Sequence, residues 1–119
     1  MVKTSKKILY RRNNRLKLEM FAYPKYKKQL EDNSIQSFRY FENVSRIVDA
    51  IDESLDIISE SYKGEEKVRM LSKHYFQKPP KNLVQLTMSE NYSENTLRNW
   101  EMEFFDILSD CLGLSDFVI

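Results

Sequence analysis

The side chains best suited to directed hydrogen bonding are concentrated at residues 93 to 99. Asn95, Arg98 and Asn99 are spaced by three and four residues, so a helix would place them on one face. Arginine can donate two parallel hydrogen bonds to guanine, and asparagine can bond the edge of adenine in the same bidentate way. These residue types therefore predict contact with DNA. The predicted contact set in this segment is Ser93, Glu94, Asn95, Thr96, Arg98 and Asn99.

The residues before this set predict a short helix and a tight turn. Leu83 and Leu86 give the helix one apolar face, and Asn82 is a suitable N-cap. Asn91 would form the turn, because asparagine tolerates a positive φ better than most residues. Glu90 departs from the pattern, since an apolar residue is usual before such a turn.

A second helix is predicted from Glu94 to about Leu112, capped by Ser93 and closed by Gly113. Together the two helices match a helix-turn-helix, in which the second helix enters the major groove of DNA. An ordinary helical hairpin is the alternative interpretation. The second helix is expected to bury Leu97, Trp100, Phe104, Ile107, Leu108 and Cys111, with Met102 facing outward.

The charge distribution indicates a basic N-terminal segment. Residues 1–28 hold ten Lys or Arg and one acid, whereas the rest of the chain holds nine bases and seventeen acids. Such a segment suits contact with phosphate, but it also suits a solvated tail or docking on the acidic part of a second copy. The predicted backbone contacts are Arg11, Arg12, Arg15, Lys78 and Lys81.

The rest of the sequence predicts an all-α fold with one short arm. Residues 5–21 and 24–32 are expected as two helices separated by Pro24, forming a basic N-terminal arm over residues 1–33. A helical domain over residues 34–119 would contain the helix-turn-helix at about residues 64–113. Gly64 is expected to end its long central helix as a left-handed cap, before a support helix at residues 65–76.

The central helix, residues 37–62, carries a heptad stripe of apolar residues. This stripe predicts packing inside its own domain, with a homodimer seam as the alternative. The stripe consists of Phe41, Val44, Val48, Ile51, Leu55, Ile58 and Tyr62.

No pattern in the sequence indicates catalysis, a cofactor or a metal. The acids of the central helix, Asp49, Asp52, Glu53, Asp56 and Glu60, follow a helix surface without a loop that could complete a metal site. His74 is the only histidine, and we expect it to be structural. Neither a small-molecule substrate nor a membrane span is expected, and the single Cys111 favours a reducing, cytoplasmic compartment.

Two segments of the chain resemble the RinA-type activators of phage late genes, which are related to the ArpU-like phage regulators. The run Tyr23-Pro24-Lys25-Tyr26-Lys27-Lys28-Gln29-Leu30-Glu31-Asp32 is similar to an element near the N-terminus of those activators. Residues 64–114 are similar to the helix-turn-helix that the family shares with sigma factor region 4. The second helix departs from the family in its acids, Glu94, Glu101, Glu103 and Asp106, beside the single base Arg98.

The resemblance implies a transcription activator that binds double-stranded DNA at a late promoter and assists host RNA polymerase in the bacterial cytoplasm. Two alternatives remain at this stage. The acidic second helix favours a protein-binding adaptor of the transcription machinery without sequence-specific DNA binding. A small terminase subunit has a similar motif followed by an oligomerising helix.

Overall fold

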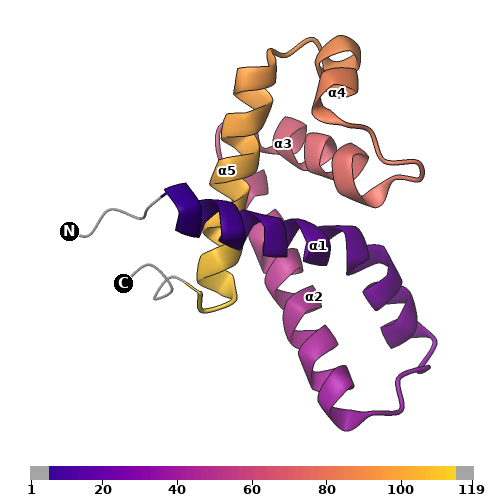
Figure 1. Ribbon diagram of the computed structural model, residues 1–119. Coiled ribbons are helices and arrows are strands. Elements are labelled where there is room, and N and C mark those ends of the chain that lie inside the picture. The colour runs from indigo at the N-terminus through magenta and orange to yellow at the C-terminus, as the bar shows by residue number, and fades with distance from the viewer. Residues whose placement is uncertain (1–5, 115–119) are drawn as a thin grey trace.

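The computed structural model describes residues 6–114, and it has the predicted all-α fold. Figure 1 shows α1 crossing α5, while α3 and α4 lie beside the N-terminal part of α5. Helix α5 contacts each of the other four α-helices, so it is the centre of the arrangement. In the described part of the chain there is no strand, and the elements are α1 (Lys6–Glu31), α2 (Phe38–Ser59), α3 (Gly64–Leu71), a π-helical turn η1 (Ser72–Phe76), α4 (Leu83–Glu90) and α5 (Glu94–Cys111).

A single helix, α1, replaces the two helices predicted on either side of Pro24. Proline lacks an N–H and crowds the carbonyl four residues earlier, so it normally ends a helix. Here Met20 is completely buried, and the Tyr23 ring lies 4.7 Å from that of Phe76, between centroids. The Tyr23 hydroxyl also donates a hydrogen bond to Asp52. These contacts hold the residues before Pro24 against the core, so the predicted break is wrong.

Helix α1 packs into the core and does not project from the domain as an arm. Leu16 and Met20 have no exposed surface, and α1 contacts α2, η1 and α5. The apolar stripe of α1 has helical spacing, and burying it requires contact with the other helices. Most bases of α1 remain on its outer side: Lys6, Lys7, Arg11, Arg15, Lys25 and Lys28 are exposed.

The apolar stripe of α2 lies in the core, as predicted for packing within one domain. Its residues Val44, Val48, Ile51 and Ile58 are buried. The two ends of the stripe differ, because Phe41 is 43% exposed and Tyr62 lies beyond the helix, 82% exposed. Because the middle of the stripe packs inside the domain, a dimer seam would need another face of α2.

Gly64 begins α3, and the prediction that it ends the preceding helix as a left-handed cap is wrong. Helix α2 ends at Ser59, and the left-handed residue is Lys63, with φ of 56°. A Cβ on Gly64 would lie 2.0 Å from the carbonyl oxygen of Ser59. Glycine is therefore required because the start of α3 approaches the end of α2 too closely for any side chain.

The predicted support helix over residues 65–76 is built from α3 followed by η1. Leu71 and Tyr75 are buried as predicted, and Val68 and Phe76 are half-buried. Helix α3 contacts α2 and α5, and η1 contacts α1 and α4. This segment therefore connects the N-terminal helices to the α4–α5 pair.

Candidate nucleic-acid interface

The connection between α4 and α5 has the local geometry predicted from its residues. The side chain of Asn82 accepts from the N–H of Gln85 at 2.8 Å, and Gln85 Oε1 accepts from the N–H of Asn82 at 2.9 Å. Asn91 has φ of 61° and ψ of 36°, which is the left-handed backbone expected there. Ser93 Oγ accepts from the N–H of Thr96 at 3.1 Å and caps α5. These side chains satisfy backbone donors at the start of both helices.

Tyr92 fixes this turn against the rest of the domain. Its ring packs edge-on against Trp100, with centroids 4.7 Å apart, and the ammonium of Lys63 lies 5.4 Å from its centroid. A hydrogen bond to Glu66, together with burial, raises the pKa of Tyr92 above its usual value. The turn is therefore held from both α3 and α5.

Glu90, which departed from the expected pattern, forms ion pairs with the support segment. Its carboxylate accepts a short hydrogen bond from Lys73, and its Oε2 lies 3.2 Å from Nε of Arg69. The bond to Lys73, with a further contribution from Arg69, lowers the pKa of Glu90. The end of α4 is thus joined to α3 and η1 by charge in place of an apolar contact. The sequence does not predict a role for Arg69 or Lys73. The signal for them is Glu90, because an acid where an apolar residue is usual indicates a base nearby.

The predicted contact set at the start of α5 faces away from the core. Ser93, Glu94, Asn95, Arg98 and Asn99 are exposed, and Thr96 is half-buried. Leu97 on the other side of the helix has no exposed surface. The guanidinium of Arg98 bonds Glu94 at 2.7 Å, one turn earlier. This end of α5 therefore presents two amides, two hydroxyls and one balanced charge pair.

The acids further along α5 are engaged inside the domain. Glu101 is buried, and it accepts a hydrogen bond from the Tyr75 hydroxyl at 2.7 Å. Lys17 of α1 and Nε2 of His74 also lie near this carboxylate, at 3.8 and 3.4 Å. Burial, followed by interaction with Glu101, raises the pKa of Tyr75 far above its usual value.

Glu103 and Asp106 join α5 to two other helices. Lys67 of α3, whose side chain is only 6% exposed, donates to Glu103 at 2.6 Å. Arg12 of α1 donates to Asp106 at 2.8 Å. The excess of acid in α5 is therefore largely matched by bases brought from α1 and α3, and it does not form one exposed negative face. Met102, predicted to face outward, is half-buried, and its sulfur accepts from the side-chain amide of Asn13 at 2.9 Å.

The structure changes the role predicted for Arg12. Its side chain is 7% exposed and paired with Asp106, so it is not available to contact a DNA backbone as predicted. Arg11 and Arg15 are exposed, and together with Arg12 they line a hollow of about 210 Å³ beside Leu114. This hollow is at the C-terminal end of α5, about 20 Å along the helix from Arg98.

Lys78 and Lys81 lie in the segment that connects η1 to α4. Lys78 is exposed and Lys81 is half-buried. The carbonyl of Lys81 accepts a hydrogen bond from Nδ1 of His74 at 2.6 Å, so this ring nitrogen carries the proton. The His74 ring also packs against Tyr75, with centroids 4.4 Å apart. His74 therefore holds the connection in place, which agrees with the structural role predicted for it.

Comparison of the chain with protein-family models, with curated proteins and with solved structures finds no match. The resemblance to phage activators therefore stays a prediction from the sequence. Over residues 6–114, no helix combines the length and apolar character needed to cross a membrane. The same residues contain no group of three or more histidine, cysteine or acidic side chains placed to hold a metal ion.

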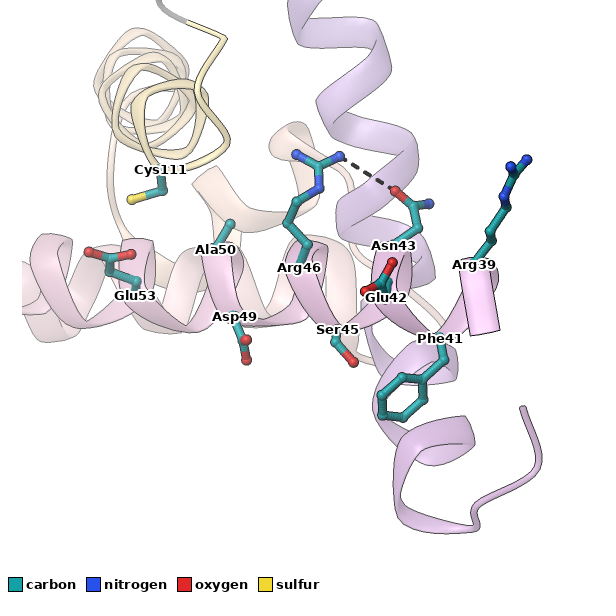
Figure 2. Close-up of a pocket in the computed structure, with 10 residues that line it drawn as sticks. All are labelled: Arg39, Phe41, Glu42, Asn43, Ser45, Arg46, Asp49, Ala50, Glu53 and Cys111. Atoms are coloured by element: carbon teal, nitrogen blue, oxygen red, sulfur yellow. Dashed lines mark hydrogen bonds between the residues drawn. The ribbon is translucent and has the colours of Figure 1, made fainter. Parts of the chain in front are cut away.

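A separate hollow of about 750 Å³ runs along the outer side of α2, far from these contact residues in sequence (Figure 2). Cys111 of α5 borders it, half-buried, beside Ala50. Most of its lining is polar and charged, and it includes Arg39, Arg46, Asp49 and Glu53. Arg46 bonds the side chain of Asn43 at 3.4 Å, as the dashed line in Figure 2 marks.

Proposed function

We propose that this protein is a sequence-specific DNA-binding activator of phage late genes, which acts with host RNA polymerase in the bacterial cytoplasm. In this proposal α4 and α5 form a helix-turn-helix, and the first turns of α5 enter the major groove. The function is binding and not catalysis. The observation that carries the proposal is the outward set at the start of α5, where exposed Asn95, Arg98 and Asn99 follow a capped turn.

The pairing of acids within α5 supports this proposal over a protein-binding adaptor. The adaptor hypothesis was motivated by Glu101, Glu103 and Asp106. These three carboxylates bond Tyr75, Lys67 and Arg12 respectively. The repulsion of phosphate expected from an acidic helix is reduced to one residue of the contact face, Glu94, and Arg98 balances its charge.

The placement of the bases suggests which of them meet the DNA backbone. Lys78 and Lys81 precede α4, at the end of the domain that holds the start of α5. Arg11 and Arg15 lie near Leu114, at the other end of α5. We therefore assign the backbone contacts that orient α5 to the two lysines. Arg11 and Arg15 would reach a more distant phosphate, if the duplex extends along α5.

Enrichment of binding sites from a randomised duplex pool, followed by fluorescence anisotropy, tests the proposal. The enriched duplex is expected to bind about 1000-fold more tightly than a scrambled duplex of equal composition at physiological salt. Arg98→Ala should reduce this preference, with a cost of about 1–3 kcal/mol on the enriched site alone. Lys78→Ala with Lys81→Ala should weaken binding to both duplexes and reduce the slope against salt concentration.

Two outcomes would reject the proposal. If no sequence is enriched, and binding to all duplexes is equal and steeply dependent on salt, α5 does not read bases. If Arg98→Ala weakens both duplexes by the same factor, Arg98 contacts the backbone and not a base. Lys6→Ala with Lys7→Ala is the matched control for the lysine pair, because it removes the same charge at exposed positions that have no assigned DNA contact.

A further inference from the structure

The unpaired charges on the outer sides of α1 and α2 are separated by sign. On α1, Leu18, Phe21, Lys25 and Lys28 are exposed and share one side of the helix, and we call them the basic α1 surface. Leu18 is 71% exposed and Phe21 is 46% exposed. Neither lysine forms an ion pair with any residue in the described range 6–114. The Phe21 ring packs on one side against Tyr75 of η1, with centroids 4.8 Å apart. This surface therefore combines free positive charge with apolar side chains that are partly exposed.

The C-terminal half of α2 has the opposite character. Asp49, Glu53, Asp56, Ile57 and Glu60 are exposed along one side, and we call them the acidic α2 surface. Ile57 is 47% exposed. Unlike Glu101, Glu103 and Asp106 of α5, these four acids make no ion pair within the described part of the chain. Asp49 and Glu53 border the hollow along α2 (Figure 2).

We propose that the basic α1 surface of one copy binds the acidic α2 surface of a second copy. Both surfaces extend about 15 Å along their helices. An antiparallel alignment places Lys25 opposite Glu53, Lys28 opposite Asp49 and Phe21 opposite Ile57. Each copy thus offers two pairs of opposite charge beside one apolar contact, and Leu18 falls opposite Glu60.

Phosphate contact alone does not account for the basic α1 surface. Phosphate recognition needs charge and hydrogen-bond donors, but it does not need Leu18 and Phe21 exposed beside the bases. The N-terminal half of α2 carries Arg39 and Arg46, which would repel lysines, so the contact is confined to the C-terminal half. Because the two surfaces differ, the contact is head-to-tail, and in an open assembly the copy at each end retains one free surface.

Charge reversal on each surface tests the contact in the absence of DNA, so it is independent of the proposed function. The unmodified protein should associate as its concentration is raised towards ~1 mM in sedimentation at low salt, and high salt should disperse it. Lys25→Glu with Lys28→Glu should weaken association at least about tenfold, and so should Asp49→Lys with Glu53→Lys. All four positions are exposed, and circular dichroism verifies that the helices remain.

Mixing distinguishes a direct contact from a general effect of charge. The two double variants are each expected to stay monomeric alone and to associate when mixed, because the reversed α1 of one matches the reversed α2 of the other. The variant with all four changes should associate by itself. The matched controls are Lys6→Glu with Lys7→Glu and Glu31→Lys with Glu65→Lys, which change net charge equally at exposed sites outside both surfaces.

The proposal is overturned if the unmodified protein stays monomeric over the whole concentration range at low salt. It is also overturned if the folded double variants remain monomeric when mixed, or if the control variants weaken association as much as the reversals do.

Discussion

The guanidinium of Arg12 lies 2.8 Å from the carboxylate of Asp106, although the two residues are 94 positions apart in the chain. This ion pair joins the N-terminal helix to the last helix. Arg12 is almost completely buried, whereas Asp106 is 63% exposed. Part of the positive charge of the N-terminal segment thus balances negative charge on α5.

Removing the acid from this pair should destabilise the fold. Asp106→Asn leaves the buried guanidinium of Arg12 without its charged partner, and we expect the free energy of unfolding to fall by about 1–3 kcal/mol. Urea titration measures the change. Asp110→Asn, at an exposed position of the same helix, should change it by less than about 0.5 kcal/mol. Equal effects of the two variants would show that the ion pair does not stabilise the fold.

The two glycines should respond differently to a methyl group. In Gly64→Ala the new Cβ would overlap the carbonyl of Ser59, so we expect a loss of about 2 kcal/mol or more. Gly113 has φ of 73° and open space around it, so Gly113→Ala should lose only about 1 kcal/mol from backbone strain. Thermal unfolding of both variants shows which one loses more stability. The close approach of α2 and α3 would be rejected if Gly64→Ala were the milder change.

Glu90 should make stability depend on pH in the acid range. Its pKa is lowered in the folded state, so its ion pairs stabilise the fold above the unfolded-state pKa of about 4.5. This stabilisation is lost as the pH falls through the folded-state pKa. Glu90→Gln lacks the charge, so the difference in unfolding free energy between it and the unmodified protein should be largest near neutral pH and shrink in acid. A difference that does not change with pH would rule out the charge as its source.

Tyr75 should make stability fall in strong base. Burial and Glu101 raise its folded-state pKa, so the fold keeps this hydroxyl protonated. The stabilisation is complete below the unfolded-state pKa near 10 and is lost as the pH rises above it. We expect the unfolding free energy to be flat from pH 8 to about 9.5 and then to decline. In Tyr75→Phe that decline should be smaller, and an unchanged slope would assign the effect to other tyrosines.

Glu94 should weaken DNA binding under the proposed function. Its carboxylate holds Arg98 at 2.7 Å and places a negative charge at the start of α5. Glu94→Gln should strengthen binding to every duplex by roughly fivefold at low salt, because it removes a negative charge that repels phosphate. Glu65→Gln, at an exposed position of α3, is the control for the change in net charge. A loss of binding in Glu94→Gln would instead indicate that Glu94 accepts from a base or orients Arg98.

The residue types predict the local features of the fold. Asn91 takes a left-handed backbone and Ser93 caps α5, because both depend on a side chain and its own backbone. The outward face at the start of α5 also followed from helical spacing. The middle of the α2 stripe lies in the core as predicted, since a regular apolar period must be buried somewhere, whereas Phe41 and Tyr62 at its ends are exposed.

Contacts between distant segments were decided only by the tertiary structure. Pro24 lies inside a helix because Met20 and Tyr23 are anchored in the core, which the local rule for proline does not include. Glu90 is compatible with its position because Lys73 and Arg69, from the preceding helical segments, form ion pairs with it. Sequence determined which residues carry charge and which backbone turns they favour. Packing decided which charges meet, because an ion pair depends on distance in space and not on position in the chain.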